Sequence, residues 1–77
     1  MKLYVLESDD YAGVYYTGRN NPNGTPDVIN SIEKAELYKS IQDASFARGL
    51  MKNPLNKGFV IREVEVTIKL GYIVKEK

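Results

Sequence analysis

The chain has 77 residues, of which 43% are hydrophobic and 27% are charged, and its formal net charge is +1. This length predicts one small domain, residues 1–77, and the hydrophobic content is typical of a folded chain and too high for a disordered one. The near balance of 11 basic and 10 acidic residues lacks the basic excess of a duplex DNA binder, and no apolar run is long enough to span a membrane.

The chain contains neither Cys nor His. Disulfides and thiolate metal sites are therefore impossible, and the commonest zinc ligand and the usual general base near neutral pH are missing. The start, MKLYVLESDD, has too short an apolar run for a secretory signal, so we expect a cytoplasmic protein. We predict that it is not an enzyme and that it uses no cofactor and no metal.

Two short segments near the N-terminus have the composition of β-strands. These are Lys2–Ser8 and Gly13–Gly18, and the turn-forming residues Asp9–Gly13 between them predict a hairpin. Bulky side chains alternate onto both faces of these strands, as Leu3 and Tyr4 show. We expect one face to be the core and the other to be partly covered or functional, but the pattern does not say which face a helix would cover.

The segment Thr17–Asn30, TGRNNPNGTPDVIN, is predicted to be an exposed loop. Its two glycines loosely resemble a phosphate-binding loop, but such a loop needs Lys-Ser/Thr after the second Gly, and here Thr25–Pro26 follows. Asn23–Gly24 is typical of a tight turn, since both residue types tolerate positive φ. We expect Val28 and Ile29 to anchor the far end of the loop to the core.

A helix is predicted over Ile41–Lys52. Ser40 is the candidate N-cap, and Asp43 three residues later suits the positive start of the helix. Asn53–Pro54 is predicted to stop it. The expected core stripe consists of Ile41, Ala44, Ala47 and Met51, with Leu50 beside it. Upstream, Ser31 is predicted to cap a helical turn over Ile32–Ala35, and Glu36–Lys39 is predicted to be extended.

The last third of the chain is predicted to form strands. From Val64 to Leu70, apolar and polar residues alternate, which is typical of a strand with one buried face. Phe59 and Ile61 have the opposite parity, so we predict a β-bulge near Arg62 that brings all of them onto one face. Gly71 is a candidate turn before a short final edge strand.

Together these segments predict an α+β fold. The expected architecture is a small antiparallel sheet of order β-β-α-β, with a further C-terminal strand as an option and one helix packed on one face.

Tyrosine is the most suggestive residue type for function, with six Tyr against two Phe and no Trp. Tyrosines are enriched at protein interfaces, and we place the candidate contact surface on the outer sheet face and the Thr17–Asn30 loop. The candidate partner-binding residues are Tyr11, Tyr15, Arg19, Asn20, Asn21 and Asn23. Two alternatives remain open, namely simple core packing of the tyrosines and single-stranded nucleic-acid binding through Tyr15, Arg19 and lysines.

The acidic residues Glu7, Asp9 and Asp10 form the densest carboxylate cluster. Hard cations prefer several oxygen ligands, but the spacing of a known calcium loop is missing. We interpret these side chains as solvated turn carboxylates. A further possibility for so small a domain is a homodimer formed through an edge strand, which would offset the limited core.

One segment matches a pattern of the form (D/S)-x-x-K-A-x-x-(F/Y)-x-(S/T)-x-x-(D/E)-A. The matching residues are Ser31, Lys34, Ala35, Tyr38, Ser40, Asp43 and Ala44. With the start MKLYVL and the closing GFVIREVEV, the chain resembles small phage and prophage proteins, mainly from Gram-positive bacteria. The resemblance implies an accessory protein that binds and modulates or inhibits a host protein in the host cytoplasm.

Overall fold

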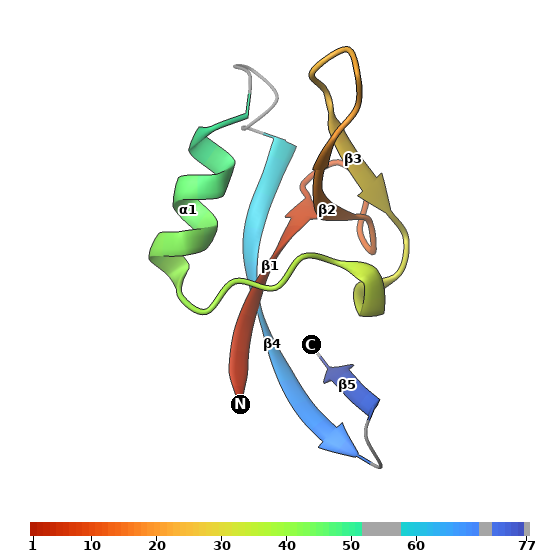
Figure 1. Ribbon diagram of the computed structural model, residues 1–77, viewed down its shortest axis with the longest axis vertical. Helices are drawn as coiled ribbons and strands as arrows, with labels where there is room; N and C mark the ends of the chain where they lie inside the picture. The colour runs from red at the N-terminus through yellow and green to blue at the C-terminus, as the bar shows by residue number, and fades with distance from the viewer. Residues whose placement is uncertain (52–57, 70–71, 77) are drawn as a thin grey trace.

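The computed structural model describes residues 1–51, 58–69 and 72–76, and it has the α+β architecture that the sequence predicts (Figure 1). Five strands form one antiparallel sheet in the order β3-β2-β1-β4-β5. The elements are β1 (Lys2–Ser8), β2 (Tyr15–Asn20), β3 (Pro26–Ile29), the 3₁₀ turn η1 (Ile32–Lys34), α1 (Ile41–Gly49), β4 (Phe59–Lys69) and β5 (Tyr72–Glu76). The optional C-terminal strand is therefore present as β5.

Strand β1 is the centre of the sheet. It pairs with β4 along its whole length, from Lys2 opposite Glu65 to Ser8 opposite Phe59. Its pairing with β2 is confined to one end, where Glu7 lies opposite Tyr15. The two strands of the predicted N-terminal hairpin therefore diverge soon after they meet, and the second strand, β2, lies two residues later than the predicted Gly13–Gly18.

Beyond the point where β2 diverges, the segment that precedes α1 pairs with the edge of β1 in its place. The backbone of Tyr38 exchanges two hydrogen bonds with that of Tyr4, with N···O distances of 2.9 and 2.8 Å. Two residues earlier, the N–H of Glu36 donates to the carbonyl of Tyr16 on β2 (3.0 Å). The extended conformation predicted for Glu36–Lys39 thus satisfies backbone groups of both strands, as buried polar groups require.

The sequence predicted a loop along the whole segment Thr17–Asn30. This prediction is wrong, because β2 and β3 form a hairpin within the segment. Tyr15 and Tyr16 pair with Ile29 and Val28, which explains how the far end is anchored. Between Tyr16 and Asn20 the register shifts, and Gly18 at φ +86° supplies the positive φ of this bulge.

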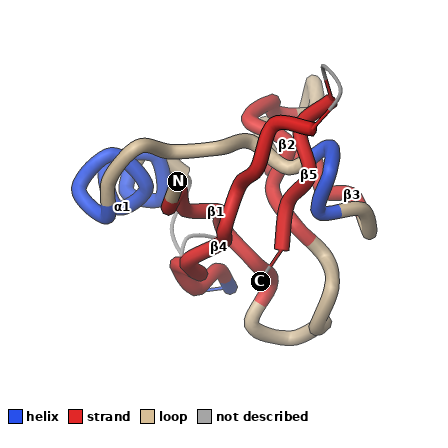
Figure 2. The backbone as a smooth tube through the Cα atoms, turned by 90° about the horizontal axis from the view of Figure 1, so that it is seen from below, coloured by secondary structure: helices blue, strands red, loops and turns tan. Residues whose placement is uncertain are grey.

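Both faces of the sheet are covered, and each has its own core. Helix α1 packs on one face, as the tube view from below also shows (Figure 2). The buried residues on that side are Leu6, Tyr16, Ala44, Met51 and Phe59. The stretch around η1 covers the other face, where the buried residues are Val5, Tyr15, Ala35, Val64 and Val66. The bulky residues on both faces of β1 are explained by this double burial, and no outer sheet face is left at β1 for a partner.

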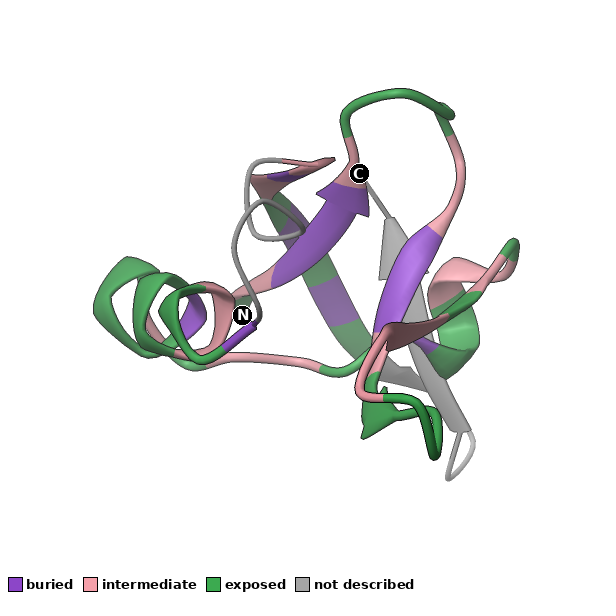
Figure 3. Ribbon diagram, turned by 90° about the horizontal axis from the view of Figure 1, so that it is seen from above, coloured by how far each residue is buried: buried purple, intermediate pink, exposed green. Residues whose placement is uncertain are grey.

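The predicted β-bulge near Arg62 is wrong. Strand β4 pairs with β1 in unbroken register, so successive side chains keep alternating between the faces. Phe59 and Ile61 join the α1 side, whereas Val64 joins the η1 side. The change of parity in the sequence marks the point where the buried face of the strand changes from one core to the other. Figure 3 shows the separate buried stretches along the sheet.

Helix α1 begins as predicted and ends earlier. The Ser40 hydroxyl oxygen accepts a hydrogen bond from the N–H of Asp43 (3.0 Å), which satisfies one of the free amides of the first turn. The helix ends at Gly49, before the predicted end at Lys52. The predicted stop at Asn53–Pro54 and the predicted turn at Gly71 lie outside the described residues. For the upstream turn, Ser31 occupies the cap position of η1 but its side chain makes no cap hydrogen bond.

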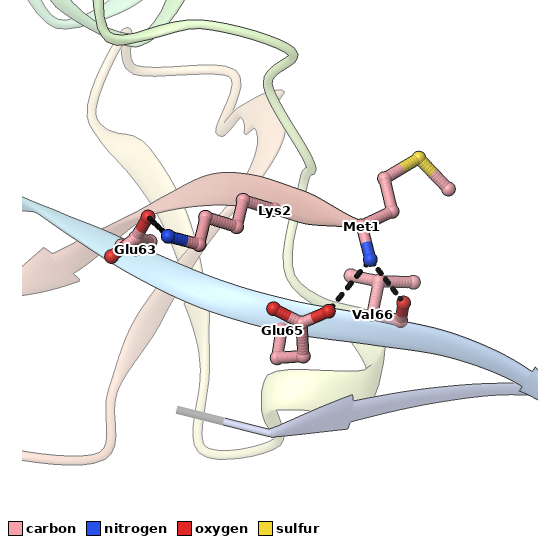
Figure 4. Close-up of polar contacts among 5 residues, drawn as sticks. All are labelled: Met1, Lys2, Glu63, Glu65 and Val66. Carbon is pink, nitrogen blue, oxygen red and sulfur yellow. Dashed lines mark hydrogen bonds and ion pairs between the residues drawn. The ribbon is translucent and has the colours of Figure 1, made fainter.

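Surface ion pairs join the start of the chain to β4 (Figure 4). The Met1 amine lies 2.6 Å from Oε1 of Glu65 and donates to the carbonyl of Val66 at 3.2 Å. This amine lowers the pKa of Glu65, first by its hydrogen bond and then by its charge. Lys2 lies 3.7 Å from Glu63. Because these groups are exposed, they contribute little to stability.

Candidate functional site

The tip of the β2–β3 hairpin is held rigid by its own asparagines. The N–H of Gly24 donates to the carbonyl of Asn21 (2.9 Å), and Gly24 has φ +87°, as the predicted turn requires. The Asn21 side-chain amide donates to Oγ1 of Thr25 (3.1 Å), and Oδ1 of Asn23 accepts from both the N–H (3.1 Å) and the hydroxyl (2.6 Å) of Thr25. These two asparagines therefore build the turn as well as being exposed on it.

Arg19 and Asn20 lie at the end of β2, just before this tip, and both are exposed. The Tyr16 hydroxyl donates to Oδ1 of Asn20 (3.1 Å). The guanidinium of Arg19 makes no hydrogen bond or ion pair within the part of the chain that the structure describes. Of the predicted contact residues on this hairpin, Arg19 is thus the one whose charged group is left for solvent or a partner.

The other two predicted contact residues lie elsewhere. Tyr11 is 69% exposed in the connection between β1 and β2. Tyr15 is only 5% exposed, because its ring packs into the core on the η1 side. Tyr15 is therefore a core residue, and a partner or a nucleic-acid base has no access to its ring. The nucleic-acid interpretation stays a prediction that would have to depend on Tyr11 and Arg19.

Two further tyrosines belong to the packing between the sheet and the segment before α1. Burial, together with the nearby Glu36 carboxylate, raises the pKa of Tyr16 and raises that of Tyr38 to about 12. The Tyr16 ring also meets Phe59 edge to face, with ring centroids 6.1 Å apart. Most of the tyrosines whose side chains the structure describes therefore pack in or against the two cores.

The outer side of α1 carries an apolar surface that the sequence analysis missed. Phe46 is 70% exposed and Leu50 is 72% exposed. They are four residues apart, so their side chains are neighbours on one face of the helix, and we call this pair the α1 outer surface. The predicted core stripe is therefore wrong for Leu50 and for Ile41, which are both exposed, whereas Ala44 and Met51 are buried as predicted. The available signal was Phe46 itself, a large aromatic residue on the side of the helix opposite Ala44.

A buried carboxylate lies at the junction of β1, β2 and β4. The prediction of a solvated turn carboxylate is wrong for Glu7, which lies within β1 and is 3% exposed, whereas Asp9 and Asp10 are exposed. The Glu7 oxygens accept hydrogen bonds from Nε of Arg62 (2.9 Å) and from the N–H of Gly13 (2.8 Å). A hollow of about 370 Å³ opens beside this pair, and its lining includes Asp9 and Glu63. Within the described ranges, no three His, Cys, Asp or Glu side chains are grouped so that they could hold a metal. The Arg62 guanidinium and the Glu7 carboxylate form an ion pair that links β4 to β1.

The chain matches no protein-family model, no curated protein and no solved structure. In the described part of the chain, no helix has the length and apolar character needed to cross a membrane.

Proposed function

We propose that this chain is a non-enzymatic protein-binding module whose main contact surface is the α1 outer surface. The exposure of Phe46 and Leu50 is the observation that carries this proposal. Burying these two large apolar side chains in an apolar groove of a partner would be favourable by roughly 25 cal/mol for each Å² of apolar surface removed from water. Aromatic residues on such a surface are the usual energetic centres of protein interfaces.

The hairpin tip supplies the polar part of the proposed interface. Its backbone is fixed by the hydrogen bonds of Asn21 and Asn23, so little ordering is needed when a partner binds. Arg19 offers a guanidinium that no described residue engages, and Arg is enriched at interfaces. The tip and the C-terminal end of α1 lie at the same end of the long axis (Figure 1), but α1 and β3 lie on opposite sides when the molecule is seen from below (Figure 2). A single partner would have to span that end to contact both.

The sequence pattern that we interpreted as a resemblance to small phage proteins is the reason for proposing a bacterial host protein as the partner. Binding that covers a functional surface of that protein would modulate or inhibit it, and the complex would form in the host cytoplasm. Self-association through the β3 edge is less favoured, because β3 has only four residues and begins with Pro26, which lacks an N–H. The β5 edge has no such feature.

Affinity capture from a Gram-positive host lysate tests this function with two matched variants. Phe46→Glu places a charge in the α1 outer surface, and Ser45→Glu places the same charge at an exposed position of α1 that lies about 100° around the helix from Phe46. We expect the wild type and Ser45→Glu to retain one stoichiometric protein, and Phe46→Glu to lose it, with a fall in affinity of about 30-fold or more.

The far-ultraviolet circular dichroism of both variants must match the wild type, since the substitutions are on the surface. Recovery of no stoichiometric protein by the wild type, or equal recovery by all three proteins, would contradict the proposal. In a second comparison, Arg19→Ala is expected to weaken the same complex by a smaller factor.

A further inference from the structure

The tip of the β2–β3 hairpin holds the one asparagine of the chain that is followed by glycine, Asn23–Gly24. Asn23 is exposed there. Because glycine has no side chain, its amide nitrogen can approach the side-chain carbonyl of the preceding residue more closely than that of any other residue. Asparagine is also one of the thermally labile residue types. This pair is therefore the place where a side-chain amide of the chain is most open to attack by the main chain.

The attack is a cyclisation that needs only water. The Gly24 nitrogen loses its proton to hydroxide and forms a bond to Cγ of Asn23. The bond from Cγ to Nδ2 breaks, and the amine takes a proton from water and leaves as ammonia. Water then opens the cyclic imide at either of its carbonyls, which gives an aspartate or an isoaspartate. In the isoaspartate the main chain passes through Cβ and Cγ, and each product carries one new negative charge.

The hydrogen bonds of the tip hold both reacting groups away from this path. The N–H of Gly24 donates to the carbonyl of Asn21 (2.9 Å), so the proton that must leave is engaged. Oδ1 of Asn23 accepts from the N–H (3.1 Å) and the hydroxyl (2.6 Å) of Thr25, so the side-chain carbonyl is directed towards Thr25. Ring closure requires the Asn23 side chain and the Gly24 nitrogen to turn towards each other, and these three bonds oppose that turn.

From this arrangement we propose that Asn23 is a site of spontaneous deamidation in this protein and that Thr25 controls its rate. The reaction proceeds when the tip opens locally, because only then are the Gly24 N–H and the Asn23 side chain released. Local opening of an exposed turn needs far less free energy than global unfolding. An isoaspartate lengthens the main chain between Asn21 and Gly24, so the turn between them is lost. The site goes beyond the protein-binding function and does not depend on it.

Incubation of the full chain in mildly alkaline buffer, followed by proteolysis and mass spectrometry, tests the site. We expect the mass gain of an amide-to-carboxyl exchange at Asn23 before any other asparagine, with isoaspartate among the products and an equal amount of ammonia released. Asn30 is the internal comparison, since it is also exposed but is followed by Ser31, which has a side chain. The chain unfolded in urea should react at Asn23 faster than the folded chain, because the hydrogen bonds of the tip are then absent.

Thr25→Val tests the control by the tip, since it keeps the shape of the side chain and removes the hydroxyl. Deamidation at Asn23 should become faster by about two- to tenfold, which is the factor that one hydrogen bond contributes. Thr67→Val makes the same change at an exposed position of β4 and should leave the rate unchanged. The rate at Asn30 should be equal in the wild type and both variants, which separates local opening of the tip from global unfolding.

Three results would overturn the proposal. The first is a folded wild type that keeps its Asn23 amide under conditions in which the urea-unfolded chain loses it completely. The second is deamidation at Asn30 as fast as at Asn23. The third is a Thr25→Val rate at Asn23 that is unchanged, slower, or raised only in proportion to the rate at Asn30.

Discussion

Replacing Glu7 by Gln removes a buried charge from the junction of three strands while it keeps the size of the side chain. The carboxylate accepts from Nε of Arg62 and from the N–H of Gly13. The two donors meet different oxygens of the carboxylate, and an amide has an oxygen at only one of these two positions, so only one donor keeps its acceptor. Its NH₂ group then faces the other donor.

The size of the effect follows from these two contacts. A hydrogen bond to a charged group contributes about 1.5–3 kcal/mol and a neutral one about 0.5–1.5 kcal/mol. Weakening one bond and losing the other should therefore cost about 2–4 kcal/mol. The Arg62 side chain is 58% exposed, so water can hydrate its guanidinium when the carboxylate is lost. The loss of stability is therefore smaller than for an ion pair whose remaining partner is fully buried. For a chain of this length, whose free energy of unfolding is of order 4–12 kcal/mol, this is a large fraction.

Urea unfolding followed by circular dichroism measures the loss. Glu65→Gln is the matched control, since it neutralises a carboxylate that also pairs across the sheet but is exposed, and it should lower the free energy of unfolding far less. A double-mutant cycle with Arg62→Gln should give a favourable coupling energy. If Glu7→Gln unfolds within about 0.5 kcal/mol of the wild type, the buried ion pair does not have the role assigned to it.

Three further changes test the local structure. Gly18→Ala should destabilise by about 1–2 kcal/mol in urea unfolding, because Gly18 has φ +86° and an added Cβ would lie 2.7 Å from Oε2 of Glu36. Gly13→Ala is the control for the backbone part of that cost, since Gly13 has φ +83° and an added Cβ there meets nothing within 4 Å. Ser40→Ala should cost about 1 kcal/mol through loss of the α1 cap, with a parallel fall in helical signal on mild heating. The fold keeps Tyr38 protonated up to about pH 12, whereas an unfolded tyrosine ionises near 10, so the free energy of unfolding should fall as pH rises from 10 to 12. Tyr38→Phe should remove that part of the fall, and an unchanged pH profile would contradict the burial of Tyr38.

The fold class and most elements were predictable because local signals agree with the structure. Strand β1 has the predicted bounds, and Ser40 caps α1 through the expected contact. The errors arise where tertiary contacts decide. Phe59 and Val64 have opposite parity because two separate cores cover the two faces, whereas the sequence interpretation assumed one core and therefore needed a bulge.

The candidate site was less predictable than the fold. Whether Tyr15 lies in the core or on the surface depends on what covers its side of the sheet, and no local pattern identifies η1 as that cover. β3 was missed because turn-forming residues dominate the composition around it. The exposed position of Phe46 was not predicted, because the interpretation of the helix considered only the residues of its buried stripe and not those on the opposite side. An aromatic residue off the stripe is a signal for function that a search for core positions discards.

Amide hydrogen exchange of the wild type with and without the captured protein tests the central claim most directly. The proposed interface predicts slower exchange in α1, residues 41–49, and at the hairpin tip, residues 19–25, with little change along β1 and β4, whose faces are already covered. Slower exchange confined to other parts of the chain, with α1 unchanged, would contradict the claim that this protein binds its partner through Phe46 and Leu50.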